Sequence, residues 1–326
     1  MLINLLDWKD KKVLRELDKN ARQPYSEIAR KTRISKQIVI YRLNNMVERG
    51  IIKSFITFID VKSLGYTFYD AFFKLKYCSQ EEEAEIIQSI SQMPEIGWFI
   101  STRGEWNLVI CMLAKSPEEL NETLDKIMKI LGNKVIESNF FIVIEASQMP
   151  YREALDDFTP NMKSIYIGNP QKIVLKKFDV KILKYLSDNC RFSIVDLAGK
   201  MRSTIEKVRY SIKKMENVGI IQAYKPLLDH TKIGYIWDIM LIQYSNCSKQ
   251  KKEEFIKFLK DLKQVFYLVK GVGNWNLMIE FHTKEPQELD NIRTTISTKF
   301  KSIIRGEKII QITKEHKCIF LPNITV

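Results

Sequence analysis

The chain has 326 residues, of which 45% are apolar and 28% are charged, so it can form packed cores and is not a disordered polypeptide. Its five cysteines show no metal-ligand spacing or close pairing, and no apolar run is long enough for a signal peptide or a membrane span. We therefore expect a cytoplasmic protein with no metal, no cofactor and no membrane contact, whose cysteines are buried or half-buried.

The formal net charge of +13 is concentrated in two segments. Residues 5–53 hold 13 Lys and Arg against 6 Asp and Glu, and residues 174–222 hold 11 against 5. The remaining residues balance at 28 of each sign. A surface adapted only to water would spread the excess over the whole chain, so this concentration indicates two polyanion-binding segments.

The first basic segment predicts a three-helix head. Residues 7–17 and 26–31 predict two helices, and Ser35 is a typical N-cap for a third, which ends at Gly50. Apolar residues at Val39, Leu43 and Met46 bury one face of this third helix and leave long polar side chains on the other. The last two helices form a helix-turn-helix that can enter a DNA major groove, although a bundle that only packs or dimerises has the same pattern.

The residues that follow predict an α+β domain. We expect strands at 51–61, 69–77, 96–102, 108–114 and 135–144 and helices at 80–91 and 117–131. The last four strands and two helices have the order β-α-β-β-α-β, which is typical of a ferredoxin-like domain. Residues 103–107 form the hairpin between its two central strands, with Gly104 at the turn.

The whole unit is repeated at an offset of 169 residues. Over residues 10–52 and 179–221, fifteen of the 43 aligned positions are identical, including Asp10, Arg22 and Tyr41. The second ferredoxin-like domain is predicted to have strands at 237–244 and 308–312, helices at 251–261 and 286–300, and a hairpin around 273–276. The tandem duplication gives helix-turn-helix domains at 1–62 and 173–231, ferredoxin-like regulatory or assembly domains at 63–147 and 232–326, and a linker at 148–172 with a local strand near 164–167.

This order of motifs resembles the Lrp/AsnC family of prokaryotic transcription regulators, in a tandem two-copy form. The matching residues are Leu14, Leu17, Asn20, Arg22, Ile28, Ala29, Ile34, Ser35, Val39, Arg42, Leu43, Gly50, Ile51, Ile52, Leu64, Gly65 and the hairpin at 104–108. The resemblance implies that the ferredoxin-like domains self-associate with their sheets face to face. It also implies a small-molecule effector near the hairpins, at Gly104, Trp106, Asn107, Gly273, Trp275 and Asn276.

Three features depart from the family pattern. The turn of each helix-turn-helix carries an arginine, Arg33 or Arg202, where glycine is common. The exposed faces of the two recognition helices differ. The hairpins carry Asn107 and Asn276 where the family often has aspartate, and because a neutral amide cannot pair with an ammonium group, an amino-acid effector is disfavoured.

The function that follows is DNA-binding transcription regulation by a covalent pseudo-dimer that presents two heads to double-stranded DNA. The expected contacts are Ser35, Lys36, Gln37, Tyr41, Arg42 and Asn45 in the first head and Thr204, Lys207, Arg209, Tyr210, Lys213 and Lys214 in the second.

Two other functions fit the same sequence. The chain could be an architectural DNA-binding protein of low sequence specificity, since lysine-rich heads favour phosphate contacts. It could also be a fused enzyme similar to sirohaem decarboxylases, which use histidines near the hairpin. Of His230, His282 and His316, none lies in residues 96–108, and His282 is interpreted as an isolated strand-end residue, so no catalytic residue is assigned and a non-enzyme is expected.

Overall fold

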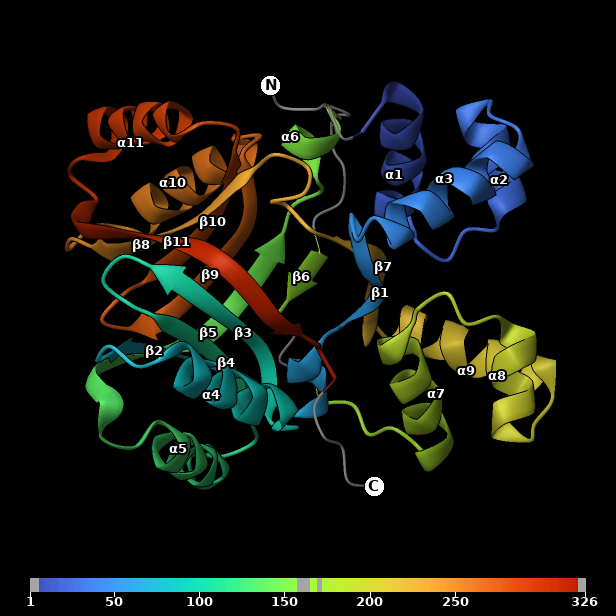
Figure 1. Cartoon of the computed structure of the whole chain (residues 1–326), viewed down its shortest axis with the longest axis horizontal. Coiled ribbons are helices and arrows are strands. Elements are labelled where there is room, and N and C mark those ends of the chain that lie inside the picture. The colour runs from blue at the N-terminus through green and yellow to red at the C-terminus, as the bar shows by residue number, and fades with distance from the viewer. Residues whose placement is uncertain (1–5, 157–164, 169–171, 322–326) are drawn as a thin grey trace.

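The computed structural model describes residues 6–156, 165–168 and 172–321. Two helical heads lie side by side on one flank of a β-structure, which carries two pairs of helices of its own (Figure 1). Each head comes from one copy of the repeat, and the β-structure is built from both copies together. No helix in the described ranges is long and apolar enough to cross a membrane.

The first head consists of α1 (Trp8–Lys19), α2 (Tyr25–Thr32) and α3 (Lys36–Glu48). The Ser35 hydroxyl accepts a hydrogen bond from the Ile38 amide at 3.4 Å, which confirms the predicted N-cap of α3. The turn between α2 and α3 places Arg33 in the left-handed region with φ 58°. This conformation is unfavourable for a residue with a Cβ, so the packing of the two helices must stabilise the turn that glycine would otherwise make.

The second head repeats this arrangement with α7 (Lys177–Asp188), α8 (Ile194–Met201) and α9 (Ile205–Asn217). Arg202 takes the same left-handed conformation, with φ 47°. The Thr204 hydroxyl caps α9 by accepting from the Lys207 amide at 3.2 Å. The duplication therefore extends to the strained turn and to the cap.

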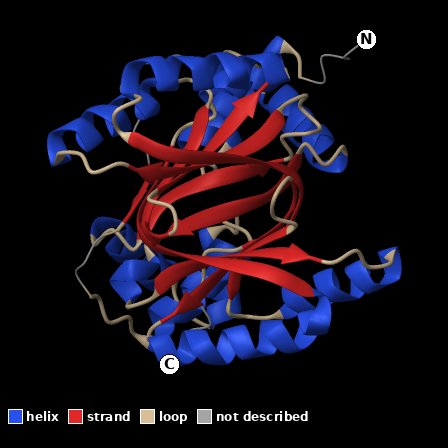
Figure 2. Ribbon diagram, turned by 90° about the vertical axis from the view of Figure 1, so that its left-hand side faces the viewer, coloured by secondary structure: helices blue, strands red, loops and turns tan. Residues whose placement is uncertain are grey.

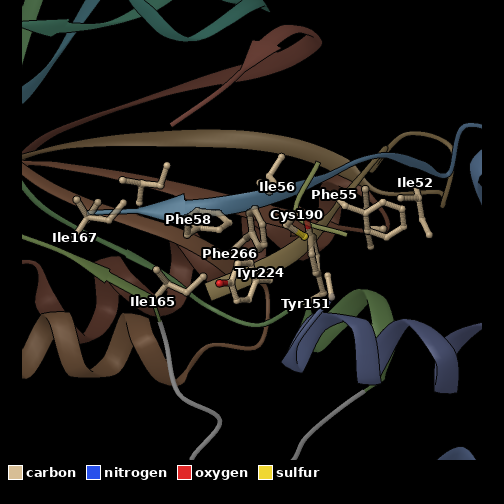
Figure 3. Packing of buried hydrophobic residues seen from close by; sticks show 14 of the residues in the cluster. Ile52, Phe55, Ile56, Phe58, Tyr151, Ile165, Ile167, Cys190, Tyr224 and Phe266 are labelled. Carbon is tan, nitrogen blue, oxygen red and sulfur yellow. The ribbon is translucent and has the colours of Figure 1, made fainter. Parts of the chain in front are cut away.

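A two-stranded ribbon joins the heads. β1 (Ile52–Ile59) leaves the first head and pairs antiparallel with β7 (Ile221–Leu228), which leaves the second. The strand expected at 51–61 is thus a connection between the copies. Its apolar side chains pack with Tyr151, Tyr224 and Phe266 and with β6 (Ile165–Ile167), as Figure 3 shows.

The first ferredoxin-like domain contains β2 (Thr67–Leu75), α4 (Gln80–Gln92), β3 (Ile96–Arg103), β4 (Leu108–Ala114), α5 (Pro117–Leu131) and β5 (Val135–Gln148). Short 3₁₀ turns at Val61–Leu64 and Gly132–Lys134 precede β2 and β5. The second domain contains β8 (Ile236–Tyr244), α10 (Lys249–Asp261), β9 (Val265–Gly273), β10 (Leu277–Thr283), α11 (Pro286–Phe300) and β11 (Ile304–Cys318). Both have the predicted β-α-β-β-α-β order.

The two sheets do not pack face to face as separate layers, which corrects the expectation. Within the described residues, nine strands form one sheet in the order β2-β4-β3-β11-β8-β10-β9-β5-β6, and β2 also pairs with β5. The first eight strands therefore close into a barrel, which Figure 2 shows with helices above and below it. Closure leaves the eight barrel strands paired on both sides, so these two domains form one folded body.

Closure depends on the length of β5 and β11. We expected these strands at 135–144 and 308–312, and both predictions were too short. The first half of each strand pairs within its own copy, and the second half crosses to β9 or β3 of the other copy. The missing residues are in strands because of partners far away in the chain, which local sequence does not reveal.

The connection between the copies is partly ordered. α6 (Arg152–Leu155) follows β5, and β6 pairs with the end of β5, which confirms a local strand near 164–167, although Ser164 lies outside the described residues. The buried Tyr151 packs against Phe266, with ring centroids 4.7 Å apart. This part of the expected linker belongs to the core.

The barrel interior is almost filled. A cavity of about 80 Å³ remains, lined mainly by aromatic and aliphatic side chains together with Asp70, His230 and Glu280. The cysteines are buried or half-buried and free, as predicted.

Candidate nucleic-acid interface

The recognition helix of the first head, α3, presents a mostly uncharged polar face. Lys36, Gln37, Ile38, Tyr41 and Asn44 are exposed, and Tyr41 reaches 70% exposure. Val39, Leu43 and Met46 are buried, as the spacing predicted. Among the predicted contacts, Ser35 is exposed but its hydroxyl caps α3, and Asn45 is half-buried. The side chains best placed to meet a ligand are therefore Lys36, Gln37 and Tyr41.

Arg42 is half-buried and engaged within the head. Its guanidinium forms ion pairs with Asp7 and Asp10, each at 2.7 Å, and the side chain is 19% exposed. These carboxylates lie at the start of α1, so the arginine ties α3 to α1. Arg42 therefore positions the recognition helix in this structure, and its predicted DNA contact stays a prediction.

The recognition helix of the second head, α9, presents a cationic face. Lys207, Arg209, Tyr210 and Lys213 are exposed, and the Lys207 ammonium lies 4.6 Å from the centroid of the Phe178 ring. Lys214 is half-buried and pairs with Asp179 at 3.0 Å, so it positions α9. Thr204 is exposed, with its hydroxyl in the cap.

One of the acidic residues that anchor the recognition helices occurs at the same position in both heads. Asp10 of the first copy corresponds to Asp179 of the second, which also accepts a hydrogen bond from the buried Ser211 hydroxyl. Burial raises the pKa of Asp179, but hydrogen bonds from Ser211 and Lys214 outweigh it and hold the pKa below its ordinary value. The identity of Asp10 and Asp179 in the repeat was the signal that could have revealed this role.

Two equivalent arginines join the heads to each other. Arg22 donates to the carbonyls of Cys190 and of Phe192, the latter at 3.1 Å, and its guanidinium lies 5.2 Å from the Tyr224 ring centroid. Arg191 donates in return to the carbonyls of Ala21 and Gln23. The first basic segment thus contacts the second directly. Together with the β1–β7 ribbon, this exchange fixes the separation of the two recognition helices, a role that sequence reasoning missed.

The hairpin residues predicted to bind an effector are largely structural. Trp106 and Trp275 are buried, so they pack in the core. The side-chain carbonyl of Asn107 accepts from the Leu75 amide at 2.6 Å, and Asn276 accepts from the Tyr244 amide at 2.7 Å. These asparagines hold each hairpin against its neighbouring strand.

A groove of about 450 Å³ does lie beside the first hairpin. It is lined by Gly104, Asn107, Lys74, Lys76, Glu83 and other residues of both copies, including Thr313. At the second hairpin, Gly273 approaches the Phe140 carbonyl of β5. Of the six predicted residues, Gly104 and Asn107 line this groove, and their part in binding an effector stays a prediction.

The position of His282 also differs from the one expected from the sequence. His282 is not isolated: its ring centroid lies 3.9 Å from that of His230, and both side chains are buried beside Trp237 and Phe266. Burial lowers the pKa of His230 to about 3 and that of His282 well below its ordinary value, so both are neutral near pH 7.

His316 reaches the neighbourhood of the first hairpin from the other copy. β11 carries it across to β3, where its Nε2 lies 2.8 Å from the Ser101 hydroxyl. Burial lowers the pKa of His316 to about 4. No group of three or more potential metal-ligating side chains occurs in the parts of the chain that the structure describes.

Both heads match a known class of domain. The family model described as "Winged helix-turn-helix DNA-binding" matches residues 6–53 and 175–222, which lie within the two basic segments. The HTH-type transcriptional regulator FL11 of Pyrococcus horikoshii is 32% identical over 127 residues, which are 39% of this chain and 83% of that regulator. The HTH-type transcriptional regulator LysM of Saccharolobus solfataricus is 27% identical over 139 residues, covering 43% of this chain and 94% of that protein.

The chain thus carries two winged helix-turn-helix domains, and it belongs to the Lrp/AsnC-like family of helix-turn-helix regulators. Over its full length the fold is similar to the crystal structure of the siroheme decarboxylase NirDL. The TM-score is 0.63 at 15% identity, covering 95% of this chain and 93% of that one. That likeness concerns the fold, and it confirms the tandem α+β architecture.

Proposed function

We propose that the chain is a DNA-binding transcription regulator that acts as a covalent pseudo-dimer. The observation that carries the proposal is that all of the net positive charge lies in the two basic segments. In both heads the recognition helix presents exposed polar side chains, and the two heads are joined by a ribbon and by paired arginines. A single chain can therefore present two recognition helices at a fixed distance from each other.

In the proposed mechanism, each recognition helix enters a major groove of the same duplex. Gln37 and Tyr41 contact base edges in the first half-site, whereas Lys207, Arg209 and Lys213 meet the DNA in the second. Helix-turn-helix dimers bind half-sites separated by about 34 Å or a multiple of that distance, which is one helical turn of DNA. The fixed heads therefore predict one preferred spacing.

Selection of duplexes from genomic DNA by the full chain, followed by footprinting, tests this proposal. We expect two protected patches on one face of the duplex. Lys36→Glu should weaken binding, while Lys249→Glu on α10, a side chain that is 91% exposed and belongs to no basic segment, should not. Absence of binding at low ionic strength, or an equal loss in both variants, would contradict a head-mediated function.

An architectural role with low specificity is supported by the cationic face of α9. Competition between a selected duplex and random-sequence duplex separates the two functions. A site-specific regulator should stay bound to the selected duplex when random-sequence duplex is in excess. An architectural protein should release the selected duplex and bind the competitor.

An enzyme similar to siroheme decarboxylase is the second candidate, and the full-length fold similarity favours it. The groove of about 450 Å³ beside the first hairpin is within the roughly 300–1,000 Å³ of a typical small-molecule site, and Ser101 in its lining contacts His316. The internal cavity argues against chemistry inside the barrel, because its volume of about 80 Å³ is far below that range. The buried histidines beside it are neutral and have no proton to release as an acid near pH 7. Addition of siroheme to the purified protein, followed by its absorption spectrum, tests this candidate: a shifted spectrum would support the enzyme.

The regulator proposal includes a small-molecule effector and self-association. The hairpin groove of about 450 Å³ has the volume for an effector. A screen of small molecules by thermal shift, repeated with Lys76→Ala, tests this part. A shift that is lost in the variant supports the groove.

Self-association with a second copy is supported by an apolar row on the outer face of β5. Ile136, Phe140, Ile142 and Ile144 are 41–56% exposed there. The equivalent outward positions of β11 are Arg305, Ile309, Gln311 and Thr313, of which one is apolar. The continuous apolar row therefore occurs on one copy and favours a closed pair of chains over an open polymer. Sedimentation of wild type and of Ile142→Lys measures it, with Gln311→Lys as the control.

A further inference from the structure

The two recognition helices differ at positions that the repeat makes directly comparable. Three outward positions of α9 carry cations, and the same positions of α3 carry none. They are Lys207, Arg209 and Lys213 in the second head, against Ile38, Ile40 and Asn44 in the first. All three cations of α9 are exposed.

The internal ion pairs increase this difference. In the first head, Arg42 is neutralised by Asp7 and Asp10. In the second, the same position is the uncharged Ser211, and Asp179 is satisfied by Ser211 and Lys214. The anchoring carboxylate of α9 therefore pairs with none of Lys207, Arg209 and Lys213, although Lys207 lies over the Phe178 ring. In α3 the anchoring carboxylates pair with Arg42.

Near the start of the recognition helix, α9 carries an acidic residue where α3 carries a neutral one. Gln37 in α3 is replaced by Glu206 in α9, and both side chains are exposed. A glutamine amide can form a bidentate pair with adenine in the major groove, while a carboxylate is repelled by phosphates and, having no donor, can only accept from a base amino group, typically that of cytosine. Tyr41 and Tyr210 are alike, with 70% and 72% exposure, so they do not separate the heads.

We infer that the two heads divide the work of recognition, an inference that rests on the proposed function. The first head reads base edges through Gln37, and Lys36 is the one exposed cation of α3. The second head holds phosphates through Lys207, Arg209 and Lys213. Since phosphate contacts position a protein and base contacts specify the sequence, the DNA site is asymmetric, with one strict half and one tolerant half.

The repeat supplies its own exchange variants. Lys207→Ile, Arg209→Ile and Lys213→Asn together give α9 the residues that α3 has at these positions. Because the other copy already accommodates those side chains in the same fold, we expect the variant to fold, and circular dichroism checks this. The reciprocal variant, Ile38→Lys, Ile40→Arg and Asn44→Lys, provides an independent second test.

The readout is the binding constant for duplexes selected by the full chain from a random-sequence library, measured by fluorescence anisotropy over a range of salt. Each phosphate contact contributes about 0.9 to the slope of log K against log salt, so the α9 exchange should lower that slope by about 2 to 3. It should weaken every duplex by a similar factor and leave the sequence preference unchanged. The reciprocal exchange should raise the slope.

A matched pair of single variants tests the reading role. Gln37→Ala should reduce discrimination against base changes in the strict half-site by about five- to 150-fold, with an unchanged salt slope. Glu206→Ala should leave discrimination unchanged. An unchanged slope in both exchange variants, or equal losses of discrimination in Gln37→Ala and Glu206→Ala, would overturn the division of work. Failure of the wild-type chain to bind any duplex would instead overturn the proposed function itself.

Discussion

The buried ion pair between Asp18 and Lys225 gives the sharpest stability prediction. Asp18 lies on α1 of the first head and Lys225 on β7 from the second copy, with Oδ1 and Nζ 2.7 Å apart. Their side chains are 1% and 6% exposed, and the Tyr151 amide donates to the other carboxylate oxygen at 3.2 Å. The equivalent residues of the repeat are Ser187 and Ile56, so the pair occurs on one side of the pseudo-dimer.

Lys225→Ile removes the ammonium group and leaves the carboxylate buried with one backbone donor. Loss of one partner of a buried pair costs about 3–5 kcal/mol, a large part of a total stability of about 5–15 kcal/mol. The double variant Asp18→Ser, Lys225→Ile recreates the uncharged equivalent site, so it should lose less than the single variant. We therefore expect Lys225→Ile to be less stable than the double variant.

Urea denaturation followed by circular dichroism measures these losses, and hydrogen exchange of the α1 and β7 amides locates them. Since the pair connects a head to the other copy, exchange should accelerate in both elements of Lys225→Ile. If Lys225→Ile were as stable as wild type, or if the double variant were the less stable of the two, the carboxylate would not depend on this lysine and the reasoning would be refuted.

Three further outcomes are expected. Burial lowers the pKa of folded His230 to about 3, so below about pH 6.5 this histidine binds a proton in the unfolded state and not in the folded state. Wild type should therefore lose about 1.4 kcal/mol of unfolding free energy per pH unit relative to His230→Phe as the pH falls. Urea titrations at several pH values measure this difference. Gly271→Ala would bring a Cβ within 2.4 Å of the Ile142 carbonyl oxygen, where β9 pairs with β5. The variant should therefore be less stable than wild type by about 1–3 kcal/mol in the same assay. Equal stability of variant and wild type would contradict the close approach of β9 to β5. Replacing Arg22 and Arg191 by alanine should let the protein bind half-sites at several spacings in a gel-shift series, and an unchanged single preferred spacing would show that the ribbon alone sets it.

Much of the fold was predictable from the sequence because it is local. Ser35 caps α3 and Gly50 adopts a positive φ where the spacing placed them, since capping depends on a few adjacent residues. Val39, Leu43 and Met46 are buried because their spacing follows the helical period. The offset of 169 residues carried each of these predictions to the second copy.

For the candidate site residues, the sequence predicted which helix face is exposed and which is buried. It did not predict which exposed-face side chains form ion pairs within the head. Lys36, Gln37 and Tyr41 are exposed as expected, since the helical period determines this. Arg42 belongs to the same outward set, yet it pairs with Asp7 and Asp10, which are more than 30 residues earlier in the chain. Pattern alone contains no information about such a partner.

By itself, the sequence determined the elements, the duplication and the location of the positive charge, because each depends on composition and on short-range periodicity. Only the tertiary structure decided that β5 and β11 cross between the copies, that the rings of His230 and His282 are in contact, and that Arg22 and Arg191 join the heads. These contacts join residues from about 50 to more than 200 positions apart, and they form because the closed barrel and the β1–β7 ribbon bring the two copies together.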